Sequence, residues 1–161
     1  MLAALETLRH TSKRAAPAWE VIDLEAELLE DINGPRAALP QVEEFVQLHW
    51  WHHDALLALG RLYGEIGEID RSVERLQRAS KVDIWETDAL NLLVTVLARH
   101  NRLAEACAVQ QRAIGRHPEE PQPYFVLAEL LLRGGRADEA RAAMAEFNRL
   151  RVMARDEQPK A

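Results

Sequence analysis

The feature that most constrains the fold is a 34-residue repeat that runs through the chain without gaps. When the sequence is shifted by 34 positions against itself, residues of similar size and polarity fall into register. The large apolar residues recur at intervals of three, four and seven, which places them on one face of a helix. The columns are Leu56, Leu90 and Tyr124; Leu59, Leu93 and Leu127; the small or slim Gly60, Val94 and Ala128; Tyr63, Leu97 and Leu131; and Ser72, Ala106 and Ala140.

A second column predicts where each helix ends and the chain reverses. It holds Asn33, Gly67, Asn101 and Gly135, again at a fixed interval. A helix that stops and turns back needs a residue with left-handed backbone angles, and Gly and Asn tolerate these best. The column therefore predicts four helical hairpins with equivalent turns.

A further apolar stripe follows each of the last three turns, so each unit contains a second helix. Pro118, Pro121 and Pro123 lie where one unit ends and the next begins, and there the missing N–H of proline costs little. Because Ala, Leu, Arg and Glu dominate the composition, local propensity also favours helix, and we expect an all-α fold. The second stripes are Val73, Leu76 and Ala79; Ala106, Val109 and Ala113; and Ala140, Met144 and Phe147.

These columns resemble the tetratricopeptide repeat family. The stretches GRLYGEIGEIDRSVERLQRAS and LAELLLRGGRADEARAAMAEF carry its pattern of Leu, a small residue, an aromatic residue or Leu, then Gly and Ala. The resemblance implies one solenoid domain over residues 1–155, a right-handed α-α superhelix of helical hairpins. Its parts would be an N-terminal helix or half-repeat (1–18), a degenerate repeat (19–52), three regular repeats (53–86, 87–120 and 121–154) and a polar tail (156–161).

The degenerate unit departs from the pattern at two positions. Glu25 stands where the other units have Leu, and Pro40 falls inside the second helix. Because an internal proline removes a helical hydrogen bond, we expect a shortened or kinked helix that begins near Gln41. Ala4 and Leu8 are in phase with the second helix of a still earlier unit.

Charge and composition exclude several function classes. The net charge of −6 disfavours a nucleic-acid backbone or an anionic membrane surface as partner. A single cysteine, Cys107, allows no internal disulfide, and its apolar neighbours predict a buried thiol. No Gly-rich phosphate loop, nucleophile elbow or paired-Cys motif occurs, so we expect neither catalysis nor a cofactor. Without a signal sequence or an apolar stretch of about 20 residues, membrane insertion is not expected and a cytoplasmic location is.

The family resemblance implies that the first helix of each unit lines a concave groove. The faces of these helices not used for packing form the expected peptide-binding surface, which has apolar and amide side chains beside several arginines. This mixture suits a peptide with a few hydrophobic anchors. The residues are Glu20, Asp23, Glu27, Asp54, Leu57, Arg61, Asp88, Asn91, Thr95, Arg99, Phe125, Glu129 and Arg133.

Five carboxylates of the degenerate unit fall on one helical stripe. Like charges at these spacings repel and weaken the helix, so binding of a basic partner would reduce the repulsion. The alternative interpretation is that the stripe is a solvated acidic face. Some family members clamp the C-terminal carboxylate of chaperones with Lys, Asn and Arg. The corresponding positions here hold Asp23, Glu27, Leu92, Gln122 and Val126, so that partner class is not expected. The stripe is Glu20, Asp23, Glu27, Glu30 and Asp31.

The run HWWHHD at residues 49–54 has two interpretations. On one helix, His49 and His53 would have metal-ligand spacing, but the repeat phase places them across a junction between units, so no metal site is expected. We expect Trp50 and Trp51 to fill that junction or form an interface, with half-exposed histidines. His100 and His117 fall at helix ends, where capping is the expected role.

The C-terminal end lacks the extra helix that usually shields the last apolar stripe of such arrays. Met144, Phe147 and Leu150 would then have an open side that forms an interface. Self-association, a covering partner or truncation of a longer protein would each explain it.

The leading hypothesis from the sequence is a non-catalytic scaffold that binds a protein or peptide segment in its groove, with basic residues of the partner on the acidic stripe. One alternative is a chaperone similar to the tetratricopeptide chaperones of type III secretion. Another is an accessory repeat segment of a larger enzyme or membrane-associated complex.

Overall fold

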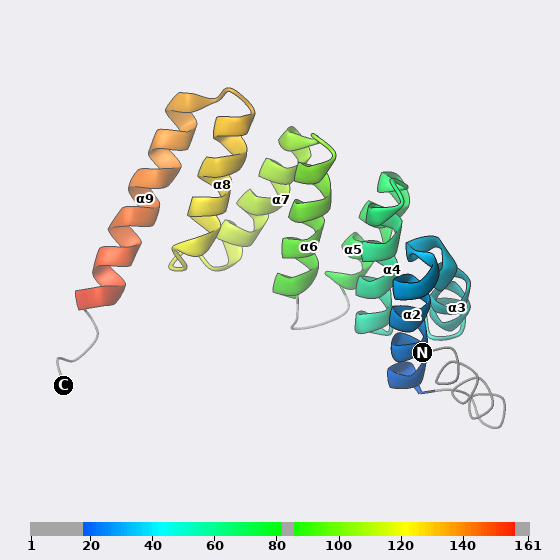
Figure 1. The fold of residues 1–161 in the computed structure, drawn as a ribbon. Helices are drawn as coiled ribbons and strands as arrows, with labels where there is room; N and C mark the ends of the chain where they lie inside the picture. Colours follow the sequence, from blue (N-terminus) through cyan, green and yellow to red (C-terminus); the bar gives the residue numbers. More distant parts are fainter. Residues whose placement is uncertain (1–17, 82–85, 157–161) are drawn as a thin grey trace. The chain divides into compact units, whose positions relative to one another are not determined.

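The computed structural model describes residues 18–81 and 86–156, and within these ranges the only regular elements are eight α-helices (Figure 1). The all-α prediction is therefore confirmed. The predicted half-repeat at residues 1–18 and the polar tail fall almost entirely outside the described residues. The helices are α2 (Trp19–Asn33), α3 (Pro35–Leu48), α4 (His53–Glu65), α5 (Ile69–Ala79), α6 (Glu86–Arg99), α7 (Leu103–Arg116), α8 (Gln122–Arg133) and α9 (Ala137–Asp156).

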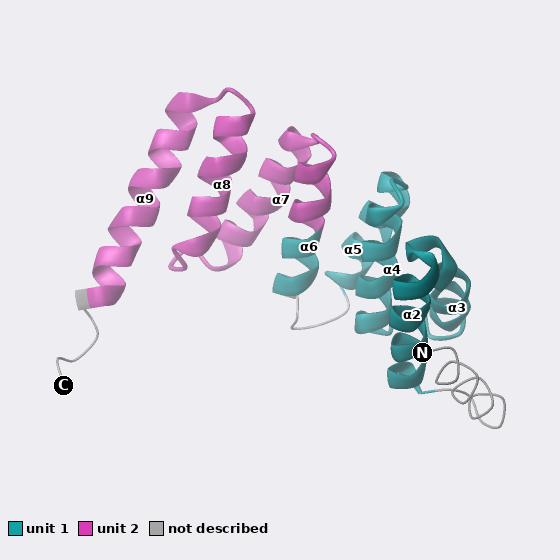
Figure 2. Ribbon diagram, viewed as in Figure 1, with its two compact units in different colours: residues 1–92 teal, residues 93–161 magenta. Residues whose placement is uncertain are grey.

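The chain forms two compact units, residues 1–92 and 93–161, with the boundary inside α6 (Figure 2). In the first unit α2 packs against α3, α3 against α4 and α4 against α5. In the second unit α7 packs against α8 and α8 against α9. The single domain over residues 1–155 remains a prediction from the sequence.

Three of the four predicted turns share one hydrogen-bond pattern. Gly67, Asn101 and Gly135 all have positive φ, at 85°, 59° and 74°. In each turn the next residue donates its N–H to a carbonyl five positions back, with N···O distances of 2.9 Å. This bond satisfies a carbonyl that the end of the helix would otherwise leave unpaired.

The first turn differs from the prediction. Asn33 stays within α2, and Gly34 takes the positive φ of 82° instead. Gly34 is at once the residue that ends α2 and the one that precedes α3, and Pro35 occupies the first position of α3. The prediction for Asn33 was wrong because this turn is shorter than the others, and the fixed φ of proline already suits a helix start.

Each of the three equivalent turns is followed by an ion pair at the same repeat position. Arg102 pairs with Glu105 at 2.6 Å and Arg136 pairs with Glu139 at 2.5 Å. In the earlier unit the signs are exchanged: Glu68 pairs with Arg71 at 3.0 Å. Both arrangements put a carboxylate at the start of the second helix, either just before it or in its first turn, where the helix dipole favours negative charge.

The core of the first unit includes an unusually close helix approach. Gly60 of α4 and Leu76 of α5 are buried, and a Cβ added to Gly60 would lie 2.5 Å from the nearer Leu76 methyl carbon. The buried Ser72 hydroxyl donates to the Gly60 carbonyl oxygen at 2.6 Å. In the second unit Cys107 is buried as predicted, and burial raises the pKa of its thiol.

Pro40 does not shorten its helix. The predicted start near Gln41 was wrong, because α3 begins at Pro35 and continues through Pro40 to Leu48. The proline side chain is exposed, and only one backbone donor is lost. The helix is held on its other face by four buried residues, Ala38, Val42, Phe45 and Val46.

At the junction between α3 and α4, the histidines are half-exposed as predicted, but the tryptophans are not buried. Trp50 and Trp51 do not fill it; their exposed fractions are 54% and 52%. The half-buried histidines lie inside instead. Nδ1 of His52 accepts the Ala55 N–H at 3.4 Å and caps α4, whereas both ring nitrogens of His53 are buried without a hydrogen-bond partner among the described residues.

The last helix is longer than the sequence suggested. The last repeat was predicted to end at residue 154, whereas α9 continues to Asp156. Leu150, expected to be open, is buried, and Met144 and Phe147 are half-buried. The large apolar residues of α9 that are exposed are Val152 and Met153, at 59% and 47%. Among the described residues, no helix is long and apolar enough to cross a membrane, and no group of three or more His, Cys, Asp or Glu could hold a metal ion.

Candidate functional site

The first helices of the second unit, α6 and α8, enclose a groove of about 600 Å³. This volume lies within the range of about 300–1,000 Å³ that is typical of small ligand pockets. Four of the predicted groove residues line it: Thr95, Arg99, Glu129 and Arg133. The structure thus brings together the polar residues that the repeat phase had aligned. The other lining residues are apolar: Val94, Ala98, Val126, Leu130 and Leu132.

The polar groups of this groove differ in how firmly they are held. Arg133 donates from its guanidinium to the Ala98 carbonyl oxygen at 2.8 Å, near the C-terminal end of α6. A cation there complements the negative end of the helix dipole, and the Ala98 oxygen also accepts the Asn101 N–H at 3.2 Å. Arg99 and Glu129 are exposed, and neither makes an ion pair with another described residue. Their charges remain available to a ligand.

Phe125 does not contribute to this groove, contrary to prediction. Its half-buried ring packs against Phe147 of α9, with the ring centroids 5.3 Å apart. The Arg151 guanidinium lies 5.5 Å from the centroid of the Phe147 ring. The aromatic side chain of Phe125 therefore joins the two helices of the last hairpin instead of facing a ligand.

Apolar residues that the sequence analysis did not assign to a site form most of the groove wall. Leu132 is the most informative of them because 56% of it is exposed although it is a large apolar residue. Leu130 and Ala98 fall outside the repeat columns and were not predicted to line the groove. A large hydrophobic residue directly before the Arg133 column was the available signal.

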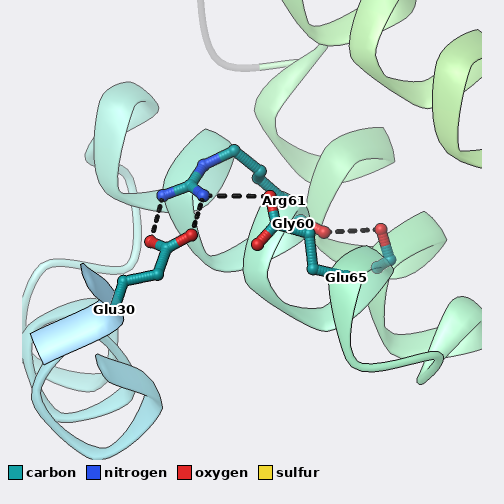
Figure 3. A network of polar contacts seen from close by, with 5 residues as sticks. Glu30, Gly60, Arg61 and Glu65 are labelled. Carbon is teal, nitrogen blue, oxygen red and sulfur yellow. Dashed lines mark hydrogen bonds and ion pairs between the residues drawn. The ribbon is translucent and has the colours of Figure 1, made fainter. Parts of the chain in front are cut away.

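In the first unit, an arginine of α4 forms an ion pair with one carboxylate of the acidic stripe of α2. Arg61 of α4 reaches Glu30 with both terminal nitrogens, at 2.6 and 2.9 Å, and also contacts Glu65 at 3.0 Å (Figure 3). These hydrogen bonds lower the pKa of Glu30, chiefly through Arg61, and raise the pKa of Arg61. Arg61 was expected to face a ligand, but its guanidinium is already occupied by this network.

The other acidic residues of the stripe make no ion pair with another described residue, although the charge of Arg61 partly offsets the repulsion at Asp23. Asp23 is half-buried, and burial followed by repulsion from Glu27 raises the pKa of its carboxyl group; Asp54 of α4 adds to the repulsion. Glu20 and Glu27 are exposed. Asp23, Glu27 and Asp54 therefore form a cluster of carboxylates across α2 and α4 that a cation would stabilise.

Because the pKa of Asp23 is raised, Asp23→Asn should increase the stability of the protein by an amount that depends on pH. Because folding disfavours the charged form, the ionised Asp23 carboxylate destabilises the folded protein at neutral pH. This destabilisation decreases as the pH falls through the raised pKa and is absent below the ordinary value of 3.8. We expect Asp23→Asn to stabilise the protein by about 0.2–0.5 kcal/mol at pH 7, the range for like charges four residues apart on a helix. Urea unfolding at pH 7 and pH 3.5 measures this, with the exposed Glu20→Gln as control. A gain that persists at pH 3.5 would show that charge is not its cause.

The remaining predicted groove residues of the first unit lie on its helices and do not line the groove between α6 and α8. Leu57 is half-buried and packs against the core of that unit. Asp88 and Asn91, on the part of α6 that belongs to this unit, are exposed.

A tetratricopeptide repeat model matches residues 57–121 and 111–149, together more than half of the chain. No curated protein sequence matches it. Among solved structures, MamA is 20% identical over 98% of this chain and 86% of its own, with a TM-score of 0.76. MamA from Desulfovibrio magneticus RS-1 is 17% identical over 98% and 87%, with a TM-score of 0.70.

YrrB, described as a TPR protein with an unusual peptide-binding site, is 19% identical over 91% of this chain and 75% of its own, with a TM-score of 0.64. Identities this low support the fold alone. Together, the repeat match, the helical hairpins and their equivalent turns establish the family: the chain belongs to the tetratricopeptide repeat family.

Proposed function

We propose that this protein is a non-catalytic interaction module that binds a peptide segment of another protein in the groove between α6 and α8. The observation that carries the proposal is the groove itself, where exposed Leu132 lies beside apolar residues. Arg99 and Glu129 border it, and neither is paired with another charge in the described part of the chain. Family membership supports a role in protein interaction, and the peptide-binding site for which YrrB is described supports a peptide as ligand.

The chemistry of the groove defines the peptide. Apolar side chains of the peptide would cover Val126 and Leu132, because burial of apolar surface supplies most of the affinity in such grooves. A carboxylate of the peptide would pair with Arg99, and Glu129 would disfavour a second acidic residue beside it.

The test is a titration with a peptide selected from a display library against the intact chain. Leu132→Asp places a charge in the apolar wall, and we expect it to weaken binding at least about tenfold, a loss of about 1.4 kcal/mol. Val152→Asp is the matched control, because Val152 is equally exposed but lies on α9. Fluorescence anisotropy of the labelled peptide measures both. If Leu132→Asp binds with unchanged affinity, or if Val152→Asp loses as much, the groove is not the site.

The acidic cluster of the first unit contributes a second element to the proposal, the preference for a partner with basic residues. Because Arg61 is committed to Glu30, the charges left for such a partner are those of Asp23, Glu27 and Asp54. In a separate titration, a lysine-rich peptide should bind the cluster at low salt, and Asp23→Lys with Glu27→Lys should abolish that binding. Equal binding by the reversed variant would remove this element without affecting the groove.

A further inference from the structure

The first unit contains a pocket that the proposed function does not use. It lies among α3, α4 and α5, has a volume of about 440 Å³ and combines aromatic, apolar and arginine side chains. Three arginines of α5, namely Arg71, Arg75 and Arg78, line it at spacings of four and three residues, which place them on one face of that helix. Trp50, just beyond the end of α3, lines the same pocket.

The arginines are held at the pocket but are not fully paired. The Arg78 guanidinium lies over the Trp50 ring, 5.2 Å from its centroid, and makes no ion pair with another described residue. Nε of Arg75 is buried and has no hydrogen-bond partner among the described residues, while one of its terminal nitrogens lies 3.6 Å from Glu74. A buried donor without a partner costs free energy that an anionic acceptor would recover.

The two carboxylates that line the pocket, Glu43 and Glu74, do not prevent an anion from reaching Arg75 and Arg78. Glu43 accepts a hydrogen bond from the Tyr63 hydroxyl, and burial followed by this bond raises the pKa of Tyr63 to about 12, so the hydroxyl remains a donor. The Glu74 side chain is 64% exposed, and its one ion pair among the described residues is the long contact to Arg75. An incoming carboxylate can displace it into solvent at little cost, since exposed ion pairs contribute about 0–1 kcal/mol.

From this arrangement we propose that the pocket binds an acidic peptide segment of a partner protein. Its carboxylates pair with Arg75 and Arg78, and a neighbouring apolar side chain packs on the face of Trp50. A short peptide suits the site better than a nucleic acid or an anionic membrane. The pocket has room for only a few side chains, and the net charge of −6 repels an extended polyanion.

The test uses the intact protein, an eight-residue fluorescein-labelled peptide of Glu and Leu, and the same peptide with Gln in place of Glu. We expect the acidic peptide alone to bind, with weaker binding at higher salt. Arg75→Gln with Arg78→Gln should lower its affinity about tenfold or more. The matched control is Arg141→Gln with Arg155→Gln, which changes net charge equally from exposed positions on α9.

Two readouts locate the site and keep a folding defect apart from a binding defect. The indole N–H resonance of Trp50, assigned with Trp50→Phe, should shift on titration, and circular dichroism should show unchanged helix in each variant. The proposal would be overturned if Arg141→Gln with Arg155→Gln lowered the affinity for the acidic peptide as much as Arg75→Gln with Arg78→Gln. It would also be overturned if a single-stranded oligonucleotide or anionic vesicles bound more tightly than the acidic peptide. A loss caused by Leu132→Asp but not by Arg75→Gln with Arg78→Gln would place acidic peptides in the α6–α8 groove instead.

Discussion

Gly60→Ala is expected to destabilise the first unit by about 1–2 kcal/mol, although alanine favours helices. Alanine in place of glycine within a helix gains up to about 1 kcal/mol. Here the new methyl group would meet Leu76, whose two nearest carbons lie 2.5 and 2.6 Å from the position of that Cβ. Leu76 is fully buried and cannot move aside freely, and overpacking of this kind costs about 1–3 kcal/mol. The steric cost therefore exceeds the gain in propensity.

The chain offers a matched control for this prediction. Gly115 of α7 is exposed, and a Cβ there would meet nothing within 4 Å, so Gly115→Ala should stabilise by up to about 1 kcal/mol. All four tryptophans belong to residues 1–92, so their fluorescence during urea unfolding reports on the first unit. Adding Leu76→Ala to Gly60→Ala should give a coupling above about 0.5 kcal/mol, because each change relieves the other. Simple additivity would contradict the close approach.

Arg61→Met is expected to cost about 1–2 kcal/mol at neutral pH. The substitution removes the counter-ion of Glu30, whose side chain is only 19% exposed, and leaves a desolvated carboxylate without its partner. The figure is below that for a fully buried pair because 37% of the Arg61 side chain is exposed and solvent screens the interaction. Urea unfolding followed by tryptophan fluorescence measures the loss.

The pH dependence of this loss has a defined sign. Arg61 lowers the pKa of Glu30, so the stabilisation is fully present above the ordinary value of 4.5 and is lost as pH falls through the lowered pKa. The difference between wild type and Arg61→Met should therefore shrink in acid. Glu30→Gln added to Arg61→Met should recover part of the stability, since a neutral amide is cheaper to bury than a charge. A difference that stays constant between pH 7 and pH 2.5 would show that Met substitutes poorly for reasons of packing alone.

Sequence periodicity predicted the helical hairpins because one repeat interval sets both the apolar face and the turn. Gly67, Asn101 and Gly135 could be identified as left-handed positions because Gly or Asn recurs at one fixed interval, and each has positive φ in the structure. The interval failed at Asn33, where a shorter turn lets Gly34 take the role. Pro40 was misjudged because the packing of the opposite face compensates for a single missing donor.

For the candidate site, the repeat phase identified which helix face carries polar residues but not which of them are already paired. Thr95, Arg99 and Arg133 line the predicted groove. The bond from Arg61 to Glu30 spans 31 positions and depends on how two hairpins stack, so no pattern within a repeat reveals it. Phe125 looked free because its partner, Phe147, lies on the other helix of the hairpin.

The ion pair that follows each equivalent turn has a consequence for how such an array can change in length. Its two residues lie three positions apart at the start of one helix, so the ion pair forms within a single hairpin and involves no residue of a neighbouring hairpin. The exchange of signs between Glu68–Arg71 and Arg102–Glu105 is tolerated within a single chain for that reason. If a hairpin were duplicated, deleted or moved along the array, the charged residues at its turn would keep their ion-pair partners. In this respect the hairpins are interchangeable parts, whereas Arg61 and Glu30 tie two particular neighbours together.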